Sequence, residues 1–209
     1  MNGLIAFFDI LGYQSFLENN PTSESVEKVL ALITDLPKQT KSEVLDRWMS
    51  IHEGLSSIPS KPVATAFSTL IFSDTIVLSI EYPPNPSEVW IQTALNYLIT
   101  ISGVLCHVMF KEGLPLRGAI AEVDFIQRQN CFAGKAIIEA YKLCHTLDLS
   151  SVVVHPSLNE KLPSIFPDWP LDDFLVHYLT PRKKFLTKLP PALSAREFVR
   201  VELKRVRRA

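Results

Sequence analysis

Two apolar segments that each carry one aspartate place the strongest limits on the fold. Residues 3–10 form a continuous apolar run broken only by Asp9, which is typical of a buried strand. Residues 65–82 are rich in β-branched and aromatic side chains around a polar pair, Ser73 and Asp74, and this pattern predicts two strands joined by a tight turn. When helices separate a strand from a following hairpin, the strand can lie beside the hairpin, so we expect Asp9 and Asp74 to lie close together.

Two neighbouring carboxylates repel each other, and a shared proton or a divalent cation relieves the repulsion. The end of an apolar strand is also a costly place for a charge that has no partner. The alternative is that the residues act separately, Asp9 as an acceptor for its own loop amides and Asp74 in an Asx turn. Both interpretations remain open at this point.

The rest of the chain alternates between helical and strand patterns. Helix-start signals occur at Asn20-Pro21 and, as a capping box, from Asn85 to Glu88. The apolar periodicity predicts helices over 13–19, 20–33, 42–55, 85–110 and 135–147, and strands over 115–125, 151–155 and 197–206. We expect a turn at 131–134 and little regular structure in the proline-rich stretch 156–191. The fold class is therefore α+β, a single domain over 1–209 with helices packed on a mainly antiparallel sheet.

Composition excludes several classes of protein. No run of eighteen apolar residues occurs, which argues against a membrane span, and an acid at position 9 argues against a signal peptide. The cysteines Cys106, Cys131 and Cys144 have no metal-binding spacing and suit a reducing cytoplasm. His145 and His155 lie near the ends of expected elements and are interpreted as core or boundary residues.

The net charge of −1 hides an uneven distribution. Residues 181–209 hold ten basic and two acidic residues, so a basic C-terminal segment with a terminal strand follows an acidic body. The acidic body makes long nucleic acid an unfavourable partner. The basic segment is either a solvated element that pairs with the body or a source of contacts to a small polyanion, with Lys183, Lys184 and Lys188 as candidates.

Four blocks of the sequence, in order, resemble class III nucleotidyl cyclases, the adenylate/guanylate cyclase catalytic domain. FDILGY at 8–13 resembles the family's F-x-D-I-x-G-F, and the Ser73-Asp74 turn resembles its G-D hairpin. RGAIA at 117–121 is similar to R-V-G-I-H, and GKAIIEAYKL at 134–143 is similar to G-x-x-V-N-x-A-x-R-L. The resemblance implies the family's fold, which is related to the ferredoxin and palm folds.

The resemblance also assigns roles to residues. Asp9, Asp74 and the Ile10 carbonyl would hold two divalent ions per site, Mn²⁺ or Mg²⁺. The triphosphate would be bound by the backbone amides of Leu11, Gly12 and Tyr13 and by a bidentate guanidinium at Arg117. The reaction would be attack of the ribose O3′ on the α-phosphorus with loss of pyrophosphate. The family implies a head-to-tail homodimer, in which the metal acids come from one subunit and the helix bearing Lys142 comes from the other.

The sequence departs from the family pattern at several positions, so not every family role can be assigned to a residue of this chain. The family's transition-state Asn and Arg fall on Ile138, which cannot hydrogen-bond through its side chain, and on Lys142, which has no planar fork. The base-reading positions fall on Leu70 and Cys131, unlike either purine-specific pattern.

The small size and the FDILG start are most similar to the pyrimidine cyclases of bacterial Pycsar anti-phage systems. This likeness implies a cytoplasmic uridylate cyclase that makes cyclic UMP from UTP, and the region near Trp48 and His52 is where we would look for a uracil-reading residue. The alternative is a degenerate cyclase-fold homodimer that binds nucleotide and regulates a partner. A third possibility, nucleic-acid binding by the basic C-terminal segment, is opposed by the acidic body.

Overall fold

The computed structural model describes residues 2–20, 22–51, 59–128, 131–166, 175–177, 180–181, 183 and 199–201. Its strands are β1 (Asn2–Ile10), β2 (Phe67–Phe72), β3 (Thr75–Glu81), β4 (Leu116–Arg128), β5 (Cys131–Gly134), β6 (Val152–Val154), β7 (Leu175–His177) and β8 (Val199–Val201). Its helices are α1 (Tyr13–Asn19), α2 (Ser23–Ile51), α3 (Ser60–Thr65), α4 (Glu88–Lys111), α5 (Lys135–Thr146), α6 (Pro156–Asn159) and α7 (Leu162–Ile165).

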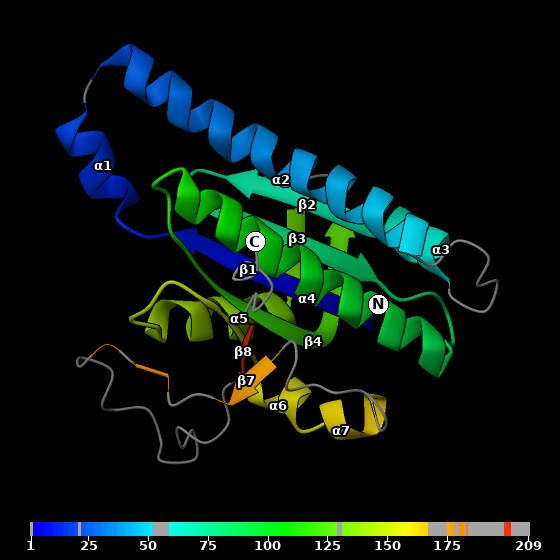
Figure 1. The fold of residues 1–209 in the computed structure, drawn as a ribbon. Coiled ribbons are helices and arrows are strands. Elements are labelled where there is room, and N and C mark those ends of the chain that lie inside the picture. Colours follow the sequence, from blue (N-terminus) through cyan, green and yellow to red (C-terminus); the bar gives the residue numbers. More distant parts are fainter. Residues whose placement is uncertain are drawn as a thin grey trace.

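One sheet organises these elements. Its strand order is β2-β3-β1-β4-β6-β8-β7, and β5 pairs with the far end of β4 (Figure 1). All pairings are antiparallel except that of β4 with β6. The expected mainly antiparallel α+β fold is therefore confirmed, with β1 at the centre between β3 and β4.

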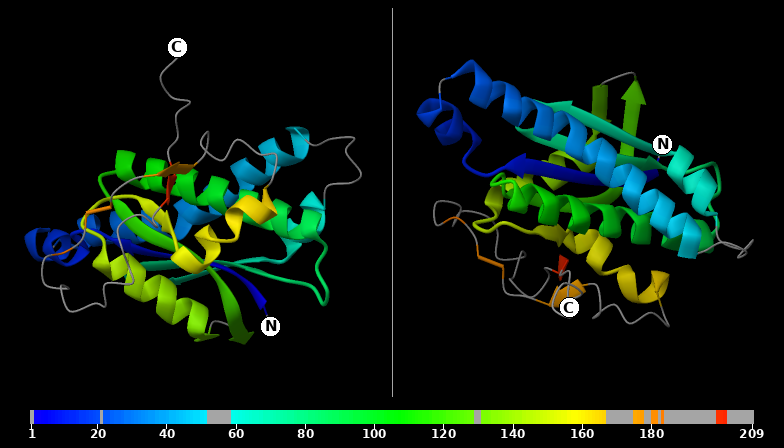
Figure 2. Two further views of the ribbon diagram at one scale, coloured as in Figure 1. Left: turned by 90° about the horizontal axis from the view of Figure 1, so that it is seen from below. Right: turned by 45° about the horizontal axis from the view of Figure 1, so that its top comes forward.

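Helices cover both faces of the sheet (Figure 2). Leu4, Ala6 and Phe8 of β1 point into the larger hydrophobic cluster, which α2 and α4 complete. Ile5 and Phe7 point to the opposite face, where α5 contributes Ala140, Leu143 and Cys144. The strict alternation along β1 explains why this strand reads as a continuous apolar run: both of its faces are buried.

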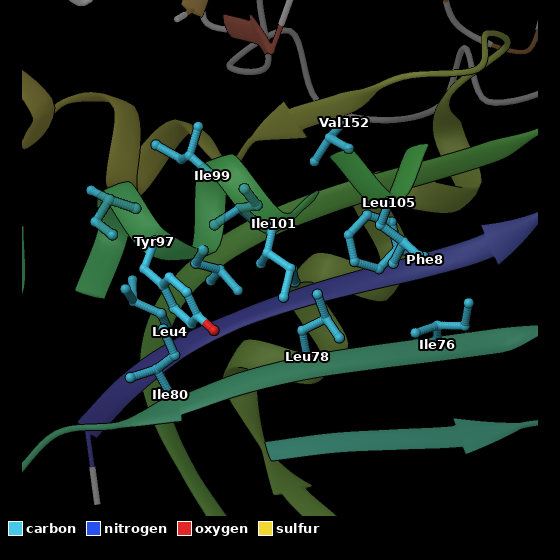
Figure 3. Packing of buried hydrophobic residues seen from close by; sticks show 14 of the residues in the cluster. Leu4, Phe8, Ile76, Leu78, Ile80, Tyr97, Ile99, Ile101, Leu105 and Val152 are labelled. Carbon is cyan, nitrogen blue, oxygen red and sulfur yellow. The ribbon is translucent and has the colours of Figure 1, made fainter. Parts of the chain in front are cut away.

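The core on the α2/α4 side is built mainly by α4. Figure 3 shows Tyr97, Ile101 and Leu105 directed toward Leu4, Phe8, Leu78 and Ile80 of the sheet. Helix α4 is long and apolar enough to cross a membrane, but 61% of its most apolar stretch is buried inside the protein. It is thus explained as the core helix of this fold.

Helix α2 differs from the expectation, since the helices expected over 20–33 and 42–55 form one element, Ser23–Ile51, that passes through Pro37; residues 52–55 lie outside the described part of the chain. An interior proline removes a hydrogen bond and costs about 3 kcal/mol. The buried positions Val29, Ile33, Thr40 and Val44 nevertheless continue one stripe across it, so packing on that face outweighs the local penalty.

Both helix starts lie two or more residues later than the sequence signals indicated. Helix α2 follows Thr22, whose Oγ1 accepts a hydrogen bond from the Ser25 amide at 3.4 Å. Helix α4 is capped by Ser87, which accepts from the Trp90 amide at 3.2 Å. Asn85 has φ 53°, a left-handed conformation that an N-cap residue does not adopt, so the capping box at Asn85 was wrong.

Most of the remaining expectations agree with the structure, and two stretches hold more regular structure than expected. Helices α1 and α5, strands β4 and β6 and the β2–β3 hairpin match the expected ranges closely. Residues 131–134, expected as a turn, form strand β5, which folds back on β4 in a hairpin. The stretch 156–191 holds the short helices α6 and α7 and strand β7, while of the expected strand 197–206 the structure describes only β8. Cys106 and Cys144 are free thiols.

Candidate active site

A pocket of about 390 Å³ opens at the C-terminal end of β1. It is lined by the β1–α1 loop, the β2–β3 turn, the start of β4, the end of α5 and one residue of the C-terminal segment. The lining residues are Asp9, Ile10, Leu11, Gly12, Tyr13, Gln14, Ser15, Asp74, Arg117, His145, Asp148 and Lys183. The pocket therefore gathers most of the site residues expected from the sequence.

Strand register brings Asp9 and Asp74 to this pocket. Asp9 lies opposite Thr75 on β3, and the Ile10 amide donates to the Asp74 carbonyl oxygen at 3.0 Å. The turn that presents Asp74 is tight because Ser73 adopts a left-handed conformation, φ 54°. The expected proximity of the two aspartates is thus met by the pairing of β1 with β3.

Asp9 also faces Arg117, which lies directly opposite it on β4. Arg117 Nε donates to Asp9 Oδ2 at 2.7 Å, and Nη2 lies 2.5 Å from the same oxygen. The two side chains are only 8% and 10% exposed, so this is a buried ion pair. A buried charge needs such a partner, because desolvation without one costs several kcal/mol.

The guanidinium of Arg117 also contacts residues other than Asp9. Its Nη2 faces Nδ1 of His145 at 3.2 Å, and its Nη1 donates to the Leu147 carbonyl oxygen at 3.4 Å. Described residues thus accept from all three nitrogens, and Nη1 alone keeps a hydrogen for a ligand. The bidentate contact to a triphosphate that the sequence indicated would require Arg117 to leave Asp9.

His145 enters the pocket from the last turn of α5. Its ring packs against Tyr141 and Phe7, with centroid distances of 4.3 and 6.3 Å. A guanidinium only donates, so the contact with Arg117 requires an unprotonated Nδ1 and places the ring hydrogen on Nε2. Burial lowers the pKa of His145, which favours this neutral form. The site role of His145 was not expected from the sequence.

The β1–α1 loop offers fewer free amides than expected. The Leu11 amide donates to the Pro115 carbonyl oxygen at 2.8 Å and is not a free donor. The loop turns at Gly12, whose φ of 76° is left-handed and favours glycine. The amides of Gly12 and Tyr13 remain as the candidate phosphate donors.

Lys183 is the one described lysine of the basic segment, and it reaches the pocket. Its amide donates to the Thr146 carbonyl oxygen, while the Asp148 amide donates to that of Pro181, both at 3.0 Å. These two bonds fix the segment beside the end of α5. Asp148, which also lines the pocket, was not expected there, and Lys184 and Lys188 lie outside the described residues.

The pocket offers some, but not all, of the oxygen ligands that a divalent cation needs. No hydrogen bond or ion pair joins the Asp74 carboxylate to another described residue, so its oxygens are free for a ligand. Asp9 engages Arg117 through Oδ2 only, and hard cations such as Mg²⁺ prefer carboxylate and carbonyl oxygens. Within the described ranges no group of three or more His, Cys, Asp or Glu forms a metal cluster. A bound cation would need ligands from the substrate or water.

Several expected residues lie elsewhere. Leu70 does not line the pocket but packs against the smaller hydrophobic cluster. Ile138 and Lys142 are exposed on α5, Ile138 with half of its surface accessible. The side chains of Cys131 and Trp48, and all of His52, lie outside the described parts of the chain.

Comparison of the sequence with protein-family models and with curated proteins gives no match. Among solved structures, the chain is similar to the catalytic core of a rhodopsin-guanylyl cyclase with converted specificity in complex with ATPαS, with a TM-score of 0.52 and 6% identity over 95% of this chain and 93% of that one. It is also similar to the adenylyl cyclase CyaB from P. aeruginosa (TM-score 0.47, 14% identity, 100% and 97% covered) and to the guanylyl cyclase Cya2 (0.46, 11%, 99% and 95%). The first of these likenesses shows that the chain has the fold of a cyclase catalytic core, as the resemblance to class III cyclases implied.

Proposed function

We propose that the protein is a nucleotidyl cyclase that converts UTP to 3′,5′-cyclic UMP and pyrophosphate. Its catalytic unit spans residues 1–209 and acts in the cytoplasm as a head-to-tail homodimer, with Mn²⁺ or Mg²⁺ as cofactor. Its product serves as a second messenger in anti-phage defence. The observation that carries the proposal is that Asp9, Asp74, Arg117 and Lys183 line one and the same pocket on a cyclase fold.

In this mechanism the chain positions the triphosphate and neutralises its charge. Asp9, Asp74 and the Ile10 carbonyl would hold two divalent ions, and such ions would supply charge that lowers the pKa of the ribose 3′-hydroxyl and shields the phosphates. Lys183 would add positive charge in the same pocket, and the free N–H of Arg117 Nη1 would donate a hydrogen bond to a phosphate oxygen. Such positioning and charge neutralisation carry most of the catalysis in phosphoryl transfer.

The remaining half of the site comes from a second subunit in this proposal. Lys142 lies exposed on α5, away from the pocket of its own chain, where it is free to act on the partner's substrate. Ile138 and Tyr141 lie on the same helix and are 50% and 48% exposed, which suits an interface. The choice of UTP rests on the likeness of the FDILG start to the pyrimidine cyclases, together with Leu70, which stands where the family has a purine-reading residue.

The test is to incubate the purified protein with each of the four nucleoside triphosphates and Mn²⁺ and to detect cyclic nucleotides by mass spectrometry. We expect cyclic UMP from UTP, and its loss in Asp74→Asn but not in Asp46→Asn, which removes an exposed charge on α2. Absence of any cyclic product overturns the enzyme assignment. Product that survives Asp74→Asn overturns the two-metal assignment, and cyclisation of another base alone overturns the choice of UTP.

A second candidate is a degenerate cyclase-fold homodimer that binds nucleotide and regulates a partner. Ile138 favours it, because an apolar side chain stands where the family has a hydrogen-bonding Asn. The same samples separate the two functions. Nucleotide binding by calorimetry without any cyclic product would establish the binding module and exclude the cyclase.

A further inference from the structure

His145 lines the pocket, and the cyclase pattern assigns it no role. We propose that His145 is a positioning residue: through Nδ1 it accepts a hydrogen bond from Arg117 Nη2 and so fixes the guanidinium against Asp9. The relevance to catalysis rests on the proposed function. The contact itself can be tested without it.

Geometry restricts what His145 can do. Its ring contacts Tyr141, four residues earlier on α5, and Phe7, two residues before Asp9 on β1. Phe7 also makes an edge-on contact with Tyr141, with interplanar angle 88°. These contacts fix the ring plane, so the direction of the Nδ1 lone pair is set by packing.

Arg117 needs a second acceptor besides Asp9. Asp9 Oδ2 accepts a hydrogen bond from Arg117 Nε and contacts Nη2. Nη2 carries two hydrogens, however, and a buried donor without an acceptor costs about 1–3 kcal/mol. His145 supplies the missing acceptor, and the Leu147 carbonyl oxygen does the same for Nη1. The guanidinium is therefore held in one plane with a single hydrogen of Nη1 left for a ligand.

If His145 positions Arg117, the affinity for phosphate should depend on the hydrogen bond that His145 Nδ1 accepts. When the acceptor is lost, Arg117 can rotate away from Asp9, and the remaining N–H no longer points in one direction. His145→Asn places an amide oxygen near the position of Nδ1, whereas His145→Leu preserves apolar bulk but accepts nothing. A purely structural role predicts that Leu is tolerated at least as well as Asn, while the positioning role predicts the reverse order.

The first experiment needs no nucleotide. In the full-length protein, ¹⁵N NMR of His145 should show protonated Nε2 and unprotonated Nδ1 at pH 7, and the Arg117 Nη hydrogens should be resolved by slow rotation. We expect that slow rotation to persist in His145→Asn and to average out in His145→Leu. A ring protonated at Nδ1, or slow Arg117 rotation that persists in the Leu variant, overturns the proposal.

The second experiment measures affinity for inorganic tripolyphosphate with Mg²⁺ by calorimetry. Loss of one hydrogen bond of about 1.4 kcal/mol corresponds to roughly tenfold weaker binding in His145→Leu, with His145→Asn staying near wild type. Equal losses in both variants overturn the positioning role. If the wild-type protein binds no tripolyphosphate, the proposed function fails, and the NMR result still decides the role of His145.

Discussion

Asp9 has two tasks at the residue scale, as counter-ion for a buried arginine and as a proposed metal ligand. Asp74, at the neighbouring turn, has only the second, because no described residue bonds its carboxylate. The two acids occupy similar places in the sequence pattern, yet their surroundings differ. Charge removal should therefore affect stability at one position and not at the other.

We expect Asp9→Asn to lower the free energy of unfolding by about 3 kcal/mol, because it leaves Arg117 charged and unpaired in a buried place. Asp74→Asn should change that free energy by less than about 0.5 kcal/mol, as is usual for a residue without such contacts. Both should abolish cyclic nucleotide formation. Urea denaturation of the three proteins measures the stabilities, and equal stability of the two variants would show that the Asp9–Arg117 pair contributes nothing.

His145 makes a pH-dependent contribution to stability whose sign is fixed. Burial lowers its pKa below the usual 6.5; nearby Asp9 and Asp74 oppose that shift, and Arg117 and Lys183 reinforce it. The unfolded chain therefore binds a proton at a higher pH than the folded chain does. Stability from this residue is complete above pH 6.5 and falls as the pH drops toward the lowered pKa.

Urea denaturation between pH 5 and 8 tests this dependence. We expect the wild-type protein to lose stability on acidification and His145→Asn to lose less. Burial also lowers the pKa of His155, so His155 adds its own part of the loss, and His155→Asn measures that part separately. A His145→Asn profile parallel to that of wild type would show that His145 does not contribute to the loss.

At the scale of single elements, the patterns that predicted structure correctly were those dominated by burial. Strand β1, the β2–β3 hairpin and helix α4 were predictable because each buries a regular set of apolar side chains. Helix α2 was not, because the stripe that holds it together across Pro37 depends on what packs against it. The cap at Ser87 was also misplaced, since the left-handed conformation of Asn85 is a property of the chain entering the helix.

Gly118 connects element packing to the site, because it follows Arg117 on β4 and lies opposite Phe8. A Cβ atom there would come within 2.5 Å of Phe8 Cδ1 and 3.0 Å of the Phe7 carbonyl oxygen. Phe8 is fully buried and has little room to move, so we expect Gly118→Ala to destabilise the protein by about 1–3 kcal/mol.

A double-mutant cycle checks that this loss comes from the Phe8 ring. Phe8→Leu removes the ring edge that the new methyl group would meet, so it should recover part of the loss when combined with Gly118→Ala. Denaturation of the two single variants and the double variant measures the coupling. Strict additivity would place the cause elsewhere, for example at the Phe7 carbonyl.

At the scale of the whole molecule, the pocket combines residues far apart in the sequence. Asp9, Asp74 and Arg117 could be predicted because each lies in a short motif on or beside a strand. His145 and Asp148 could not, because only the packing of α5 on β1 and β4 turns the end of that helix toward Asp9. The sequence did not distinguish Lys183 from the other lysines of the basic segment. Its place at the pocket depends on two main-chain hydrogen bonds that hold its segment beside Thr146.

One chain thus supplies acids, an arginine and a lysine to its own pocket, while Lys142 stays outside it. If Lys142 acts on the partner's substrate, Asp74→Asn and Lys142→Ala should complement each other across a dimer. Differently tagged subunits, co-expressed and purified through both tags, give pure heterodimers. The heterodimer of the two single variants contains one intact site of two, so we expect about half of the wild-type activity.

The matched control is the heterodimer of a wild-type subunit with the Asp74→Asn/Lys142→Ala double variant. It carries the same two substitutions, but head-to-tail sharing places one defect in each site, and no activity is expected. If Lys142 acts within its own chain instead, the order reverses: the wild-type/double heterodimer keeps half of the activity and the first heterodimer keeps none. Equal activity of the two heterodimers would remove Lys142 from the site altogether, since only a residue used in catalysis can distinguish them.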